Sequence, residues 1–269
     1  MDLSAKIRNY IRFHNWILTV IVVVLMIAAW HLAIVAFDVQ PFVLPKPADV
    51  LASVIYGAGD FLPAALSTTK SILGGFLLAV GLGVGLALVL LSSRTLERAF
   101  FPLLVGAQLV PKVALAPLLT VWLGIGRPTE IMVAFLLSFF PIVVNTMIGI
   151  KGVELGKLDV ARSMGAGPMG IFIKVTLPSA LPSIFAGMKV ASTLAVVGAI
   201  VGEFIGARDG LGNVLLTANS NFDTATMFAA ILYLTVIGMV LFFALELIEH
   251  FSIPWHHSKR GLNLTPGGA

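Results

Sequence analysis

The chain has 269 residues, of which 58% are hydrophobic and only 11% are charged, and its mean hydropathy is +1.02. A soluble domain carries about 25% charged residues, because those side chains keep its surface hydrated. The 17 basic and 13 acidic residues are too few to cover a globule of this size, so the composition argues against a soluble enzyme, a disordered chain and a nucleic-acid-binding protein. The lack of cysteine excludes disulfides and thiolate metal sites. We therefore predict an integral membrane protein.

Six segments are apolar enough to cross a bilayer, which takes about 20 residues of helix. In chain order they are residues 17–37, 71–93, 98–127, 131–150, 182–206 and 224–245. The first is too long for the core of a signal peptide and is expected to remain as an uncleaved helix. The third contains Pro111, Lys112 and Pro117, so we expect it to bend or break. The fifth contains Lys189 and Glu203, which shorten its uncharged part.

The basic residues predict the orientation of these spans. Six spans place both termini on one side, which holds eleven Lys and Arg residues against four on the other side. Cytoplasmic loops are enriched in Lys and Arg, so both termini are expected in the cytoplasm. The eleven are Lys6, Arg8, Arg12, Arg94, Arg98, Lys151, Lys157, Arg162, Lys174, Lys259 and Arg260.

This orientation divides the chain into segments. Residues 1–16 form a cytoplasmic start, 17–37 the first transmembrane helix, and 38–70 an outer loop with an amphipathic helix. A core of five helices is expected within residues 60–250, followed by a cytoplasmic tail at 251–269. The longest inner loop of the core runs from 151 to 181.

The longest inner loop contains a short helix signal, Asp159-Val-Ala-Arg-Ser-Met-Gly165. Asp is a favoured N-cap, because its carboxylate accepts the free N–H groups of a helix start. Gly165 suits the left-handed conformation that ends many helices. Ten residues later the chain reads Val175-Thr-Leu-Pro178, and Pro178 is expected to start or kink the next helix.

Together these residues resemble the signature of bacterial ABC-importer permeases, which is Glu-Ala-Ala, three residues, Gly, nine residues and Ile-x-Leu-Pro. Asp159, Val160 and Ala161 stand at the Glu-Ala-Ala positions, and Gly165 at the Gly. Leu177 and Pro178 stand at the end of the signature. Further motifs resemble the nitrate/sulfonate/taurine subgroup: Leu44-Pro-x-Pro47, Val110-Pro111, Leu115-Ala-Pro-Leu118, Trp122-Leu-Gly-Ile-Gly126, Phe140-Pro141 with Asn145, Glu203-Phe-Ile-Gly206 and Gly210-Leu-Gly212.

The resemblance implies the type I ABC-importer permease fold, an all-α polytopic membrane protein with six transmembrane helices in the bacterial inner membrane. The implied coupling helix consists of Asp159, Val160, Ala161, Arg162, Ser163, Met164 and Gly165, and it would dock on a separate ATPase. Small Ala161 and Gly165 would permit close docking, while Arg162 and Ser163 would make polar contacts. The alternative is that these residues form only a solvated turn between two spans.

The implied partners are two ABC ATPase subunits, a second permease copy in a homodimer, and a periplasmic or lipid-anchored substrate-binding protein. Membrane lipid surrounds the spans, and no nucleic acid is expected. No cofactor is expected on this chain, because Gly152-Val-Glu-Leu-Gly156-Lys157-Leu fails the phosphate-loop spacing, so ATP would be used by the partner ATPase. The implied cargo is a small polar or anionic solute of the sulfonate/taurine, nitrate, bicarbonate or pyrimidine-precursor class.

Polar residues inside the spans are candidates for the solute path. Lys112 lies mid-span, where a charge costs roughly 2.5–3.5 kcal/mol and therefore usually faces a cavity or a partner. It either lines a path for an anion, pairs with Glu203, or extends to the membrane interface. Gln108 and Asn145 either line the path or bind backbone at kinks, and Lys189 is expected to extend to the inner interface. Close helix packing is also expected at two sets of glycines, Gly81, Gly83 and Gly85, and Gly198, Gly202 and Gly206.

No catalytic constellation appears in the sequence, and His256 and His257 lack metal-ligand spacing. We therefore predict a transport subunit with no catalytic and no metal site. Two other classes remain open at this point: an ion-coupled secondary transporter using Lys112 and Glu203, and an intramembrane enzyme acting on lipid.

Overall fold

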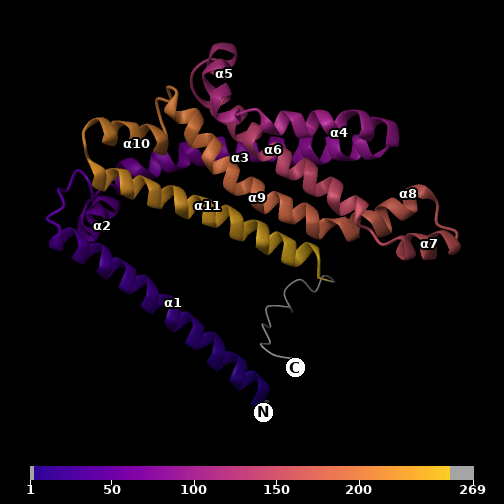
Figure 1. The fold of residues 1–269 in the computed structure, drawn as a ribbon, viewed down its shortest axis with the longest axis horizontal. Coiled ribbons are helices and arrows are strands. Elements are labelled where there is room, and N and C mark those ends of the chain that lie inside the picture. The colour runs from indigo at the N-terminus through magenta and orange to yellow at the C-terminus, as the bar shows by residue number, and fades with distance from the viewer. Residues whose placement is uncertain (1–2, 255–269) are drawn as a thin grey trace. The chain divides into compact units, whose positions relative to one another are not determined.

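The computed structural model describes residues 3–254, and side chains from residue 17 onward within that range. Every regular element in residues 3–254 is a helix (Figure 1), which confirms the predicted all-α fold. Basic residues before 17 and after 254, together with His256 and His257, lie outside the described side chains. The elements are α1 (Leu3–Ala36), α2 (Pro47–Tyr56), α3 (Ala58–Leu91), α4 (Arg94–Leu109), η1 (Lys112–Leu115), α5 (Ala116–Leu123), α6 (Arg127–Lys151), α7 (Leu155–Ser163), α8 (Pro168–Ile171), η2 (Phe172–Thr176), α9 (Leu177–Phe204), α10 (Leu211–Ser220) and α11 (Thr224–Ser252).

Within the described residues, five helices are long and apolar enough to cross a membrane, and a bent pair raises the number to six. They are Ile17–Ala36 of α1, α3, α6, the continuous helix Pro168–Phe204 and α11, with α4 and η1–α5 as the bent pair. The predicted spans are therefore found in their predicted order. α3 begins at Ala58, so it takes up the second half of the segment expected as an outer loop. The part of α3 before residue 71 buries Phe61, Ala64 and Ala65, which lie outside the span 71–93 predicted from hydropathy.

The third span is broken, as predicted, and its two parts meet at 80°. Pro111 lacks an N–H and its ring disfavours a helical residue before it. Val110 accordingly has extended backbone, with φ −64° and ψ 125°. Pro117 then lies in the first turn of α5, where its missing N–H breaks no helical hydrogen bond.

Residues 3–62 and Val214–Leu232 form one compact unit. The Trp30 ring of α1 packs against the Phe228 ring, with their centroids 5.6 Å apart. Thr224 Oγ1 donates a hydrogen bond to the Phe42 carbonyl oxygen at 2.5 Å. Only 6% of the apolar part of α1 is buried, which is typical of a helix that faces lipid.

Residues 63–213 and 233–254 form the second unit, whose centre is the close pair α6 and α9. A Cβ added at Gly198 would lie 2.5 Å from Ala134 Cα, and one at Gly202 would lie 2.6 Å from Glu130 Cα. The two backbones are therefore in contact, which confirms the predicted packing role of Gly198 and Gly202. The surrounding core consists of Ile72, Phe76, Ala79, Ala134, Ile142, Ala191, Ala195, Ala199 and Leu245.

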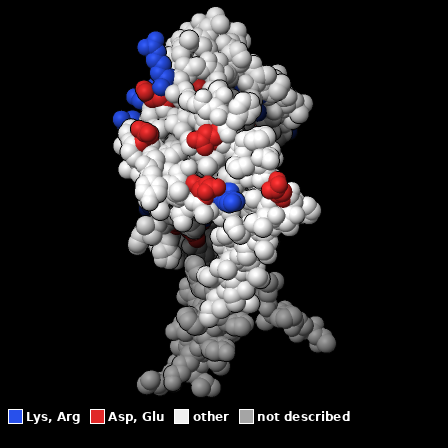
Figure 2. Space-filling model, turned by 90° about the vertical axis from the view of Figure 1, so that its left-hand side faces the viewer, with Lys and Arg blue, Asp and Glu red and all other residues white. Residues whose placement is uncertain are grey.

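Charged side chains are sparse on the surface of the molecule. Figure 2 shows one face that is mostly uncharged, with a few Lys, Arg, Asp and Glu side chains on it. Large hydrophobic side chains are exposed along α3 and α11, among them Leu66, Leu77, Val240 and Phe243. Water-soluble proteins rarely expose extended apolar areas, so these surfaces fit contact with lipid.

Candidate functional site

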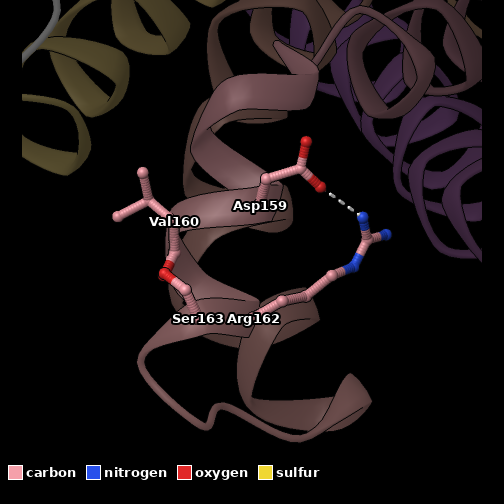
Figure 3. A network of polar contacts seen from close by, with 4 residues as sticks. All are labelled: Asp159, Val160, Arg162 and Ser163. Carbon is pink, nitrogen blue, oxygen red and sulfur yellow. Dashed lines mark hydrogen bonds and ion pairs between the residues drawn. The ribbon is translucent and has the colours of Figure 1, made fainter.

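The predicted coupling helix is α7, in the loop between α6 and α9. It spans Leu155–Ser163 and has Glu154 at the N-cap position, so it begins four residues before Asp159. The prediction that Asp159 caps this helix is therefore wrong. Asp159 Oδ1 instead accepts a hydrogen bond from Arg162 Nη1 at 2.7 Å (Figure 3). A carboxylate and a guanidinium three residues apart meet on one side of a helix, and this pairing explains why an Asp is accommodated mid-helix.

The end of α7 is the predicted one. Gly165 has a left-handed φ of +79°. Its N–H donates to the Arg162 carbonyl at 2.9 Å, and the Ala166 N–H donates to the Ala161 carbonyl at 3.1 Å. These two bonds form the Schellman motif, and Ser163 Oγ adds a bond to the Val160 carbonyl at 2.8 Å (Figure 3). The last turn of α7 is thus closed by its own hydrogen bonds.

One face of α7 lies against its own chain and another is open. Ala161 is 9% exposed, whereas Val160 is 59% and Met164 81% exposed. The small Ala161 side chain therefore lies against its own chain and does not face outward, which differs from the docking position expected from the sequence. The outward apolar surface is made by Val160 and Met164.

α7 contacts α8 and η2, and a pocket of about 360 Å³ lies among them. η2 is a π-helical segment that runs directly into α9, where Leu177 and Pro178 form the first turn. The Leu177 N–H donates to the Phe172 carbonyl, as the wider π turn requires. This turn precedes Pro178, whose missing N–H and bulky ring would disturb a regular α-helix. From Pro168 onward, the coupling loop and α9 therefore form one continuous helix.

Lys112 lies at the break in the third span. Its Nζ donates to the Gln108 carbonyl at 3.1 Å and stands 4.7 Å from the centroid of the Phe140 ring. The last turn of a helix leaves carbonyl groups without partners, so Lys112 closes the end of α4. The Gln108 side chain is exposed.

Asn145 and Lys189 both bind neighbouring groups of the helix bundle. Asn145 Nδ2 donates to the Pro141 carbonyl at 2.8 Å, which is the backbone-binding alternative. Lys189 forms an ion pair with Glu249 of α11 and lies 5.7 Å from the centroid of the Phe242 ring. Lys189 thus has a carboxylate partner from a distant segment, which its position in the sequence does not reveal.

The profile of the family described as "binding-protein-dependent transport system inner membrane component" matches residues 79–251, which contain α7 and the α6–α9 pair. The chain belongs to this family of ABC-importer permeases. It is therefore a multi-pass membrane transport subunit and not an enzyme, in keeping with relatives that are named as transport permeases.

Three relatives show how much of the permease this similarity covers. The formylaminopyrimidine transport permease protein ThiX of Halalkalibacterium halodurans is 35% identical, over 82% of this chain and 88% of its own. The riboflavin transport system permease protein RibX of Chloroflexus aurantiacus is 32% identical, over 95% and 96%. The taurine transport system permease protein TauC of Escherichia coli is 29% identical, over 87% of both chains. The predicted subgroup is thereby confirmed.

The fold has a solved counterpart. An inward-facing structure of the MetNI methionine ABC transporter matches with a TM-score of 0.64 at 20% identity, over 72% of this chain and 97% of that chain. This likeness shows that the permease has the ABC-importer permease fold.

Glu203 of the permease is fully buried and holds three segments together. Its Oε1 accepts a hydrogen bond from Thr68 Oγ1 of α3 at 2.6 Å, and its Oε2 accepts one from the Gly212 N–H at 2.6 Å. The Leu211 N–H donates in turn to Thr68 Oγ1 at 2.9 Å. Glu203 therefore binds α3 and the start of α10 and does not pair with Lys112, so that alternative is wrong.

Sequence reasoning missed a second buried carboxyl, Glu130 of α6, which is 4% exposed. Its Oε2 accepts a hydrogen bond from Ser71 Oγ of α3 at 2.5 Å. Glu130 lies one residue outside the predicted span 131–150, so hydropathy places it in a loop. The feature that could have indicated a role for Glu130 is its position in the first turn of a helix, where acidic residues are favoured.

Proposed function

We propose that this permease imports a small polar or anionic solute and receives its driving force from a separate ATPase through α7. The observation that carries the proposal is the structure of α7, a nine-residue helix within one loop whose last turn is closed by its own hydrogen bonds. It exposes Val160 and Met164 while Ala161 packs inward. An exposed apolar surface on a charged loop is typical of a docking site for another protein.

The connection from α7 to the bundle supports a mechanical role. α7 packs on α8 and η2, and these continue without interruption into α9. α9 is in turn packed backbone to backbone against α6 at Gly198 and Gly202. A displacement of α7 by an ATPase would therefore move α9 and α6 as rigid elements, as in other transitions driven by helix shifts.

The proposed assembly contains two copies of this permease, two ATPase subunits and an external substrate-binding protein. Both termini lie in the cytoplasm of a bacterium and the spans in its inner membrane, because the basic residues favour that orientation. The permease carries no cofactor, and ATP is bound by the ATPase.

The names of the relatives bear on the choice of solute. Those described above are named for formylaminopyrimidine, riboflavin and taurine. We propose a small polar solute within the sulfonate/taurine, nitrate, bicarbonate or pyrimidine-precursor class. Equilibrium binding of these compounds to the cognate substrate-binding protein tests this choice, and binding of none of them would contradict it.

An ion-coupled secondary transporter would need Lys112 and Glu203 to exchange protons along a path. Lys112 Nζ is bound to the Gln108 carbonyl, and Glu203 is bound to Thr68 and Gly212. Because Lys112 and Glu203 bind different groups and not each other, this arrangement favours the ATP-driven function over proton exchange between them.

The docking role of α7 can be tested with the double substitution Val160→Glu and Met164→Glu. Two carboxylates on the outward face should lower co-purification of the ATPase subunit by about tenfold or more, because charges would be buried without partners. Val160→Ile with Met164→Leu keeps the surface apolar and is the matched control, expected to retain binding. Unchanged ATPase binding by a well-folded Glu variant, monodisperse in size-exclusion chromatography, would contradict the proposal.

A further inference from the structure

A polar cleft of about 420 Å³ opens beside the first turn of α6, next to α3 and the turn that follows α9. Small-molecule sites commonly enclose roughly 300–1,000 Å³, so the size suits a small solute. Its lining includes Ser67, Ile125, Arg127, Glu130, Arg208 and Asp209. All of them belong to the second unit.

Two guanidinium groups line the cleft, those of Arg127 and Arg208. Arg127 and Arg208 are both exposed. Arg127 Nη2 donates to Ser67 Oγ at 3.2 Å. Neither guanidinium lies within 4.0 Å of a carboxylate oxygen in the part of the chain that the structure describes. Most of their hydrogen-bond donors are therefore free to bind a ligand.

The two acidic groups of the lining differ from each other. Glu130 is 4% exposed and its carboxyl accepts a hydrogen bond from Ser71, so a ligand in the cleft has little access to it. Asp209 is exposed. The charged groups that a ligand can reach in the cleft are thus two guanidiniums and one carboxylate.

We propose that this cleft is an outer binding site for a small solute with an anionic group, which Arg127 and Arg208 hold together. Guanidinium groups bind planar or tetrahedral oxyanions through paired N–H donors, which makes two of them a specific clamp. Asp209 accepts a hydrogen bond from an ammonium or amide group on the same solute. A sulfonate or carboxylate with a nearby nitrogen donor has this chemistry.

The position of the cleft gives it a role in transport, and the inference here rests on the proposed function. α6 begins and α9 ends beside it, at the side predicted to face outward. A solute released by a substrate-binding protein would meet Arg127 and Arg208 before it enters the helix bundle. The site would then select for an anion a second time, after the binding protein.

The lack of cysteine in the chain allows a direct test of the cleft in spheroplasts. Ser67→Cys places a single thiol beside Arg127, and Ile125→Cys provides a second reporter. Each variant is treated separately with two membrane-impermeant reagents, anionic 2-sulfonatoethyl methanethiosulfonate and cationic 2-(trimethylammonium)ethyl methanethiosulfonate. The measured quantity is the ratio of the two labelling rates. A change in thiol ionisation affects both rates equally and so cancels in this ratio.

Ser220→Cys, at the end of α10, is the matched reference thiol, because neither arginine is its neighbour in the sequence. We expect the anionic-to-cationic ratio at residue 67 to exceed the ratio at residue 220 by about tenfold, in line with the effect of a charged cleft on association rates. Arg127→Gln with Arg208→Gln should abolish this difference at residues 67 and 125 and leave residue 220 unchanged. Asp209→Asn should raise the ratio further.

Equal ratios at all three thiols, or a ratio unchanged by removal of both arginines, would overturn the proposal. So would failure of either reagent to reach residues 67 and 125 while residue 220 is labelled, because the cleft would then be closed to the outside. The labelling needs no ATPase, so these outcomes are separate from the ATPase-binding test of α7.

Discussion

At the scale of single residues, the carboxyl of Glu203 is the point at which three segments are joined. Thr68 and the Gly212 N–H both donate to it, and the Leu211 N–H donates to Thr68. Removing one partner of a buried hydrogen bond costs about 1–3 kcal/mol, because the remaining group has no water to bind. Gly210 reflects the same crowding, since it has φ +107° and a Cβ there would collide with the Glu203 carboxyl.

We predict that Glu203→Ala lowers the melting temperature of the detergent-solubilised permease by roughly 5 °C or more, since Thr68 and Gly212 lose their acceptor together. Glu97→Ala is the control, because Glu97 forms a partly exposed ion pair with Lys151, and such pairs contribute about 0–1 kcal/mol. The melting temperature can be followed by intrinsic fluorescence. An equal shift in both variants would refute a special role for Glu203.

At the scale of elements, the α6–α9 pair determines how α7 is connected to the membrane part of the permease. The Gly198 and Gly202 positions allow the two backbones to touch, and small residues such as Ala134 and Ala195 fill the neighbouring contacts. Helices in a membrane associate largely through such close packing. The four-residue spacing of the glycines predicted that α9 packs closely against another helix, but it did not predict that this helix is α6.

We predict that Gly198→Ala destabilises the permease by about 1–3 kcal/mol, because the new methyl group would meet the Ala134 backbone, which cannot move aside like a side chain. Gly81→Ala is the matched control, because no atom lies within 4 Å of a Cβ at that position of α3, so the packing role predicted for Gly81 is wrong. There the substitution should be neutral, or stabilising by up to about 1 kcal/mol through helix propensity. Thermal unfolding in detergent compares the two. Equal stability of both variants would show that the α6–α9 contact is loose.

At the scale of the whole molecule, the distribution of basic residues predicts an orientation that a single topology experiment can check. We expect Ser92→Cys, at the inner end of α3, to react with an impermeant thiol reagent only after spheroplasts are permeabilised. Ser220→Cys should react in intact spheroplasts, because both positions are exposed and they differ only in their side of the membrane. The reverse pattern would invert the assignment and place α7 outside the cell.

The sequence predicted α7 only in part. Gly165 ends the helix because a left-handed residue without a Cβ is a local requirement, readable from one position. The start at Glu154 was missed, because an Asp within a helix is compensated by Arg162 three residues on. Which face of α7 is open was likewise hidden, since Ala161 is covered by its own chain through tertiary contacts.

The amino-acid sequence by itself determined the membrane class, the order of six spans, the break at Val110–Pro111 and the family. Composition, hydropathy and proline geometry are properties of a residue or of a short window, so they can be read without a fold. Only the tertiary structure decided that Lys189 pairs with Glu249, that Glu203 binds Thr68, and that Arg127 and Arg208 share a cleft. Thr68 and Glu203 are 135 positions apart, and no local pattern specifies which distant polar groups the packing of helices will bring together.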